Sequence, residues 1–139
     1  MIDVVREKID IAKILQAVED DSTGGVVFFV GRVRDHAGDH QVVRMEYEGY
    51  EKMAKAGLQK IADAVKHQWP VKKLAIVHRL GMLELGEASV VIAVACAHRS
   101  QAFAACQFAI DTLKKTIPIW KKEYGPDGAS WVEGVVPGQ

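Results

Sequence analysis

Apolar residues recur along this chain with two different spacings, and each spacing predicts one type of secondary structure. Spacings of three and four residues predict amphipathic helices over 10–19, 51–69 and 100–117. Continuous or alternating apolar runs predict strands over 2–6, 26–34, 42–48, 71–81, 89–97 and 129–134. The uninterrupted run at 26–30 is typical of a strand covered on both faces. The alternation of helices and strands indicates an α+β fold with a mixed, mostly antiparallel sheet.

Each predicted helix has a boundary signal and an apolar face. Asp10 can cap the first helix, while Pro70 and Pro118 end the other two because proline lacks an N–H donor. The residues expected to face the core are Ile11, Ile14, Leu15, Val18, Met53, Leu58, Ile61, Val65, Phe103, Cys106, Ile110 and Leu113. We expect residues 1–139 to form a single domain, because this length is sufficient to bury one core. The strand order does not follow from the pattern.

Composition and charge exclude several classes of function. Apolar residues make up 49% of the chain and charged residues 26%, as in soluble globular proteins. The 18 lysines and arginines balance 18 acidic residues, so no broad attraction to nucleic acid or a membrane surface is expected. No signal peptide or membrane-spanning run is visible, which favours a cytoplasmic location. Cys96 and Cys106 lack the spacing of a metal or redox motif, and we expect two buried free thiols.

Two short cationic clusters lie where predicted elements end or begin. Arg32 and Arg34 flank Val33 at a strand end, and the strand period places both guanidinium groups on one face. Paired arginines suit a phosphate or carboxylate, although solvated strand-end charges are an equal alternative. His98 and Arg99 precede the last helix, whose N-terminal N–H groups and dipole favour an anion. A simple cap by the following serine is the competing interpretation.

A third cationic cluster, in the stretch TLKKTIPIWKKEY, surrounds a proline and a tryptophan. Lysines in the last helical turn, Lys114 among them, suit the helix dipole without any function. That argument does not cover Lys121 and Lys122, which follow the proline. We expect Trp120 to anchor this segment in the body and Glu123 to orient one ammonium group. Apolar surroundings and nearby cations can lower the pKa of a lysine enough for proton transfer or nucleophilic attack, but spacing alone favours a structural role.

The remaining histidines give weaker signals. The glycine-centred segment DHAGDH is more typical of a polar turn than of a metal site, because no third ligand has a fixed spacing. The pair His78-Arg79 leads into a turn and is interpreted as structural. Glycine-rich nucleotide-binding motifs do not occur in the sequence. Neither a metal nor a cofactor is expected.

Six segments in this chain resemble, in the same order, the large catalytic subunit of molybdopterin synthase. They extend nearly from end to end and read FFVGRVRDHAGD, MEYEGYEKMA, VHRLGMLELGE, AHRSQAF, IDTLKKTIPIWKKE and WVEG. The resemblance implies an α/β-hammerhead type of fold and a homodimer at the centre of a heterotetramer. The implied partner is a small ubiquitin-like sulfur-carrier subunit with a C-terminal Gly-Gly thiocarboxylate. The implied reaction inserts two sulfurs into a pterin, cyclic pyranopterin monophosphate (precursor Z), and forms the molybdopterin dithiolene without a metal.

The resemblance also implies site residues, all of the expected type in this chain. The family's catalytic lysines match Lys114 and Lys121. Its substrate-binding positions match Arg32, Val33, Arg34, His98, Arg99, Lys114, Lys121, Lys122 and Glu123. One departure follows Glu133, where family members can have a basic residue and this chain has Gly-Val-Val. If that basic residue helps to bind the substrate, other groups must replace it here.

Two of these residue groups lie at opposite ends of one predicted helix. Ser100 and Lys114 are separated by about 21 Å, at 1.5 Å per helical residue. One compact pocket cannot easily contact both ends, so we hypothesise a site shared between the two chains of a homodimer. The main alternative function is a non-catalytic module that binds a ubiquitin-like tail or a phosphorylated ligand. An acyl- or phosphoryl-transfer enzyme is a third possibility, but no nucleophile with its base is recognisable.

Overall fold

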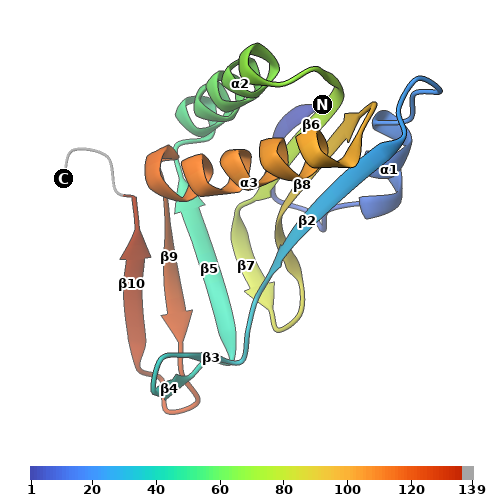
Figure 1. The fold of residues 1–139 in the computed structure, drawn as a ribbon. Helices are drawn as coiled ribbons and strands as arrows, with labels where there is room; N and C mark the ends of the chain where they lie inside the picture. Colours follow the sequence, from blue (N-terminus) through green and yellow to red (C-terminus); the bar gives the residue numbers. More distant parts are fainter. Residues whose placement is uncertain (136–139) are drawn as a thin grey trace.

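The computed structural model describes residues 1–135, which form ten strands and three helices (Figure 1). In chain order these are β1 (Ile2–Val5), α1 (Ile11–Ala17), β2 (Gly25–Arg32), β3 (His36–Ala37), β4 (His40–Gln41), β5 (Arg44–Gly49), α2 (Glu51–Gln68), β6 (Val71–Arg79), β7 (Gly81–Glu84), β8 (Ala88–Cys96), α3 (Arg99–Thr116), β9 (Ile119–Tyr124) and β10 (Ser130–Gly134). The predicted α+β class is confirmed.

The first sheet has the strand order β1-β6-β8-β2. β1 runs parallel to β6, whereas β8 is antiparallel to both β6 and β2, so the sheet is mixed as predicted. Residues 90–96 of β8 are fully buried because this apolar strand has a neighbour on each side and a layer over each face. β2 corrects a prediction: it is an edge strand of this sheet, its apolar side chains are mostly half-buried, and Val26 is exposed.

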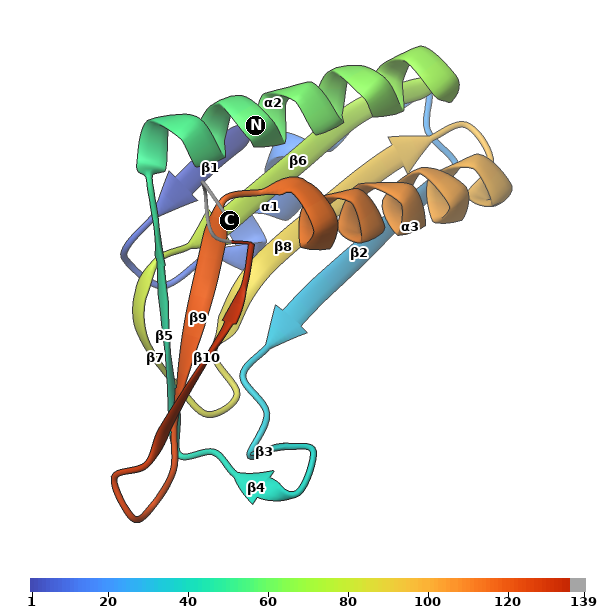
Figure 2. The ribbon, with the colours of Figure 1, turned by 90° about the vertical axis from the view of Figure 1, so that its left-hand side faces the viewer.

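Helices cover both faces of this sheet. α2 and α3 lie side by side over one face, and α1 lies behind the other (Figures 1 and 2). The larger core cluster, which includes Leu58 and Ile92, lies beneath α2 and α3. The smaller cluster contains Ile14 and Val18 of α1 with Val91 and other residues of the sheet. Burial of these apolar side chains is the main force that fixes the helices on the sheet.

The predicted inner faces of the helices are partly wrong. Ile11, Leu15 and Met53 are exposed, and Phe103 exposes 63% of its surface. The face of α3 that packs on the sheet consists instead of Ala102, Ala105, Cys106, Ala109, Ile110 and Leu113. Small alanine side chains allow a helix to approach a sheet closely, and Phe103 lies about 100° around the helix from Ala102. The large aromatic side chain therefore points away from the core.

Helix boundaries agree better with the sequence. Asp10 caps α1 as predicted, because its carboxylate accepts the backbone N–H of Lys13 at 3.1 Å. α1 nevertheless ends at Ala17, earlier than predicted. Pro70 and Pro118 each follow the end of a helix, as expected of residues without an N–H donor.

The second sheet has the order β10-β9-β5-β7 and is antiparallel throughout. β5 confirms the predicted alternation, since Met45 and Tyr47 are buried and the charged residues between them are not. Neither β7 nor β9 was predicted, because β7 falls in an expected turn and charges interrupt the apolar pattern of β9. The segment DHAGDH forms the two-stranded β3–β4 hairpin at the far end of this sheet (Figure 1).

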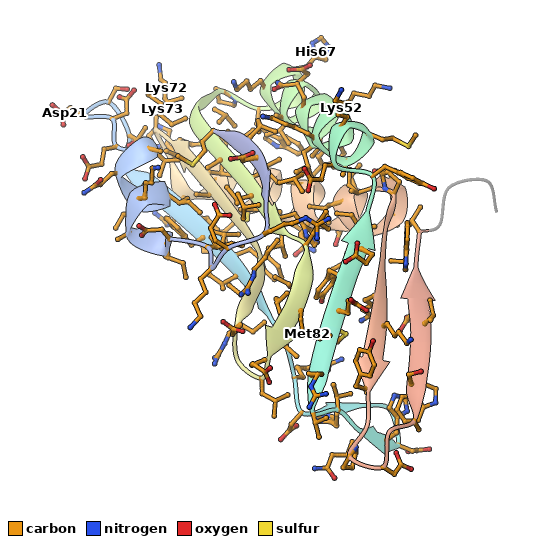
Figure 3. All side chains as sticks on the ribbon, turned by 180° about the vertical axis from the view of Figure 1, so that it is seen from behind. Asp21, Lys52, His67, Lys72, Lys73 and Met82 are labelled. Carbon is orange, nitrogen blue, oxygen red and sulfur yellow. The ribbon has the colours of Figure 1, made fainter. Side chains whose placement is uncertain are left out.

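Polar side chains cluster on part of the surface. Those at the ends of α2 and β6 and in the loop before β2 project outward (Figure 3), among them Asp21, Lys52, His67, Lys72 and Lys73. Both cysteines are buried and free, as predicted. No helix within residues 1–135 combines the length and apolar character needed to cross a bilayer.

Candidate active site

A pocket of about 240 Å³ lies between the C-terminal end of α3 and the second sheet. Its lining comes from α3, β5, β6, β9 and β10 and includes Tyr47, His78, Leu113, Lys114, Lys121 and Glu133. The two lysines that the family resemblance implies as catalytic therefore share one pocket. They come together because the chain turns at Pro118 from the end of α3 into β9, which leaves that end of the helix at a steep angle (Figures 1 and 2).

Lys114 lies in the last turn of α3, where a cation also suits the helix dipole. Its side chain is exposed to solvent over part of its surface, and the remainder is buried where it lines the pocket. This burial lowers the pKa of Lys114, and the positive charge of Lys121 lowers it further, while Glu133 acts in the opposite direction. Lys114 consequently provides a larger fraction of neutral amine at a given pH than an isolated lysine would.

Lys121 projects from β9 between two carboxylates. Its Nζ lies 3.6 Å from Oε1 of Glu123 and 4.0 Å from Oε2 of Glu133. Glu133 is the cross-strand partner of Lys121 on β10, whereas Glu123 is two residues further along β9 and only 2% exposed. The expectation that Glu123 orients an ammonium group agrees with this geometry.

Strand alternation divides the segment 120–124 between two faces. Lys121 and Glu123 share the face that carries the pocket, and Lys122 points to the opposite face. There the ammonium of Lys122 lies 5.3 Å from the ring centroid of Tyr124. Trp120 is half-buried on that same face and makes an edge contact with Tyr50, with centroids 6.1 Å apart. Trp120 thus packs β9 against the start of α2, on the side away from Lys121, and also borders the pocket rim.

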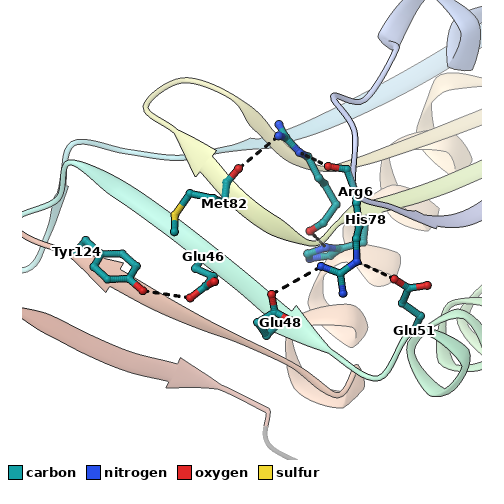
Figure 4. Close-up of polar contacts among 8 residues, drawn as sticks. Arg6, Glu46, Glu48, Glu51, His78, Met82 and Tyr124 are labelled. Atoms are coloured by element: carbon teal, nitrogen blue, oxygen red, sulfur yellow. Dashed lines mark hydrogen bonds and ion pairs between the residues drawn. The ribbon is translucent and has the colours of Figure 1, made fainter.

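His78 is a pocket residue that the sequence interpretation missed. Its side chain is buried at the end of β6, and its Nδ1–H donates to the carbonyl of Arg79 at 2.9 Å (Figure 4). Tyr47 makes an edge contact with the ring. Burial lowers the pKa of His78 to about 4, so the ring is neutral near pH 7. The signal in the sequence was a histidine inside an apolar strand, but nothing local indicated that this strand end faces Lys114.

The two other cationic clusters lie away from this pocket within one chain. Arg32 ends β2 and donates through Nε to the carbonyl of Gly86 at 3.0 Å, while Arg34 is exposed. Val33 between them is buried. His98 and Arg99 are exposed at the N-terminal end of α3, opposite to the end that bears Lys114. His98 occupies the N-cap position, so the competing interpretation of a serine cap is wrong, and the helix starts at Arg99 rather than one residue later.

The charge of the pocket is balanced by carboxylates rather than by a metal-binding group. Within residues 1–135, no three His, Cys, Asp or Glu side chains converge as metal ligands would. The thiols of Cys96 and Cys106 do not line the pocket, and burial raises the pKa of both, to about 11 for Cys106. An α+β fold whose C-terminal hairpin completes a pocket lined by two lysines and a buried neutral histidine has the features of a candidate enzyme active site.

Comparison with known proteins identifies the family. A family model described as MoaE protein matches residues 4–116. The molybdopterin synthase catalytic subunit of a Nostoc species is 48% identical over 121 residues, which cover 85% of this chain and 73% of that protein. The chain belongs to the MoaE family, the catalytic subunits of molybdopterin synthase, which act in molybdenum cofactor biosynthesis. The resemblance noted in the sequence is confirmed.

Solved structures agree with this assignment. The crystal structure of molybdopterin synthase from Staphylococcus aureus superimposes with a TM-score of 0.90 at 35% identity, covering 96% of each chain. A complex of subunits 1 and 2 of the molybdopterin-converting factor from Helicobacter pylori shares the fold, with a TM-score of 0.73. The matching chain of that complex is 21% identical to this protein, and the superposition covers 99% of this protein and 90% of the matching chain.

Proposed function

We propose that this protein transfers two sulfurs to cyclic pyranopterin monophosphate and forms the dithiolene of molybdopterin. The sulfur arrives as a thiocarboxylate on the C-terminal Gly-Gly of a small ubiquitin-like partner. The observation that carries this proposal is the pocket shared by Lys114 and Lys121, where both amines lie beside the end of α3. The two ammonium groups of this pocket can pair with the thiocarboxylate and with the substrate phosphate.

The lysines supply the proton chemistry of this proposal. Each sulfur attack forms a C–S bond to the pterin and breaks a C–O bond, and the departing oxygen needs a proton. Water must then cleave the bond between the sulfur and the partner's acyl carbon, which leaves the sulfur on the pterin and a carboxylate on the partner. An ammonium group at Lys114 or Lys121 can donate the proton that the departing oxygen needs. The lowered pKa of Lys114 suits it to this role, because an ammonium group of lower pKa is a stronger acid and loses its proton more readily.

The partner and the location follow from the same proposal. The Helicobacter pylori relative is a complex of two different subunits, which supports a small partner subunit for this chain as well. We place that partner's tail in the lysine pocket and two such partners around a central homodimer. The two free thiols, Cys96 and Cys106, are compatible with a reducing cytoplasm.

The homodimer has a specific role in this proposal, because it completes the substrate site. Arg99 and Lys114 lie near opposite ends of α3, so one substrate can contact both only if they come from different chains. Two α3 helices that pack antiparallel about a twofold axis near Gln107 would bring these ends together. Phe103 supports this arrangement, since a side chain 63% exposed on that stretch of α3 is typical of an interface. Arg32 and Arg34 would then reach the substrate phosphate from the end of the neighbouring β2.

The direct test is conversion of cyclic pyranopterin monophosphate by this protein and a thiocarboxylated partner. We expect Lys121→Ala to lower kcat by at least about a hundredfold, within the range of general acid catalysis. Lys115→Ala is the matched control, because Lys115 neighbours Lys114 but does not line the pocket. A non-catalytic module would bind the partner tail equally well in all three proteins and convert no substrate. That result would refute the proposal.

A further inference from the structure

We infer that His40 is a positioning residue for Lys121 and acts through Glu123. This inference rests on the proposed function only in the importance it gives to Lys121. His40 belongs to β4, in the hairpin that the sequence suggested was an ordinary polar turn. It is distant from Lys121 in the chain and contacts it only through the buried carboxylate of Glu123.

Two contacts fix the imidazole ring of His40. Its Nε2 lies 2.9 Å from Oε2 of Glu123, and because a carboxylate accepts, Nε2 carries the proton and donates. The ring also stacks on Trp131 of β10, with centroids 3.8 Å apart and planes 17° from parallel. A hydrogen bond at one edge and a stacked face leave the ring little rotational freedom.

Glu123 is a buried carboxylate, and one of its two oxygens accepts no hydrogen bond from the described residues. Its side chain is 2% exposed, and Oε1 accepts no hydrogen bond from any described residue. Nζ of Lys121 is the cation beside Oε1, at 3.6 Å, which is an ion-pair distance but too long for a hydrogen bond. A buried carboxylate is costly unless partners satisfy both oxygens. His40 satisfies one oxygen, and Oε1 remains available to Lys121.

The carboxylate of Glu123 is therefore shared between His40 and Lys121. With His40 in place, Glu123 has one oxygen fixed and cannot move fully onto the ammonium group of Lys121. Without His40, the ammonium is the remaining cationic partner, and the carboxylate would close onto it to relieve its desolvation. A tightly paired ammonium is a weaker proton donor and a less available amine. His40 thus keeps Lys121 available to ligands in the pocket.

The experiment compares His40→Ala, His40→Gln and His36→Ala in the complete chain. His36 is the matched control, because it lies in the same hairpin but pairs only with its exposed neighbour Asp35. The first measurement is the rate at which an amine-reactive acylating reagent modifies Lys121 at fixed pH. Peptide mass spectrometry monitors this reaction, and Lys115 is the internal reference. The second is kcat and KM for pterin conversion.

We expect His40→Ala to slow Lys121 acylation and to lower kcat, each about tenfold, as for loss of one hydrogen bond to a charged group. KM should change by less than about twofold, since this contact does not touch substrate. His40→Gln should recover most of both rates, because its amide N–H can donate to Glu123, and His36→Ala should match the unmodified protein.

Unchanged acylation and kcat in a folded His40→Ala protein would overturn the inference. Equal losses in His40→Gln and His40→Ala would overturn it as well, because they would assign the effect to the stacked ring rather than to the hydrogen bond. Failure of the proposed function can be distinguished from failure of this inference about His40. In that case the unmodified protein converts no pterin, while the acylation rate of Lys121 still reports on His40.

Discussion

The proposed shared site predicts that two inactive variants restore activity when they form one dimer. The variants are Lys114→Ala and Arg99→Ala, which alter opposite ends of α3. Each homodimer lacks one essential group in both of its sites. In a mixed dimer, one site receives both substitutions and the other receives neither, because each site takes Lys114 from one chain and Arg99 from the other.

The expected magnitude follows from this geometry and the statistics of mixing. The helix positions of Arg99 and Lys114 are separated by about 22 Å, so a single bound pterin does not bridge them within one chain. Random reassociation of equal amounts makes about half of the dimers mixed, and one of two sites works in each. The mixture should therefore recover about a quarter of the unmodified activity, and purified mixed dimers about half.

The assay is pterin conversion after co-expression of the two variants with different affinity tags, followed by purification through both tags. Lys114→Ala mixed with Lys121→Ala is the matched control. These two residues line one pocket of the same chain, so both sites of that mixed dimer remain defective. Activity of verified Lys114→Ala/Arg99→Ala mixed dimers at the level of the single variants would refute the shared site. Equal recovery in the control pair would refute the reasoning from the pocket.

Three further outcomes are expected. Lys121→Gln should raise the pKa of Lys114, because it removes a neighbouring positive charge; the pH dependence of Lys114 acylation measures this, and an unchanged or lower pKa would contradict it. Folding keeps His78 neutral, and the unfolded chain binds its proton below about pH 6.5, so the free energy of unfolding should fall by up to about 3 kcal/mol as the pH drops from 6.5 to 4. Urea unfolding at several pH values checks this, and a folded His78→Phe protein with the same pH slope would disprove it. Replacement of Cys96 and Cys106 by alanine should leave sulfur transfer largely intact, since their buried, protonated thiols lie outside the pocket; complete loss in a folded double variant would contradict this.

Local patterns predicted those elements whose burial follows a simple period. The apolar run of β8, the alternation of β5 and the Asp10 cap all agree with the structure. Phe103 shows the limit of hydrophobic periodicity, since this large apolar residue has the helical spacing of a core position but lies outside the core. Periodicity gives the spacing of a face but not how close the neighbouring sheet approaches, and here alanines occupy the contact.

The candidate site was predictable as a set of residue types but not as an arrangement. The lysines around Pro118 stood out by their density in a neutral chain. The sequence did not indicate that one of them, Lys121, lies on an unrecognised strand whose alternation turns Lys122 away. It also gave no sign that His78 ends its strand in the same pocket.

By itself, the sequence determined the element types, the positions of the cationic clusters and the family, because these depend on local spacing and on residue identity. Only the tertiary structure decided which groups meet. Pairing of β9 with β10 brings Glu133 to Lys121, and a contact across 83 positions brings His40 to Glu123. Such contacts depend on strand register and on the turn of the chain between α3 and β9. Both are set by burial of the whole core and leave no periodic trace in the segments they join.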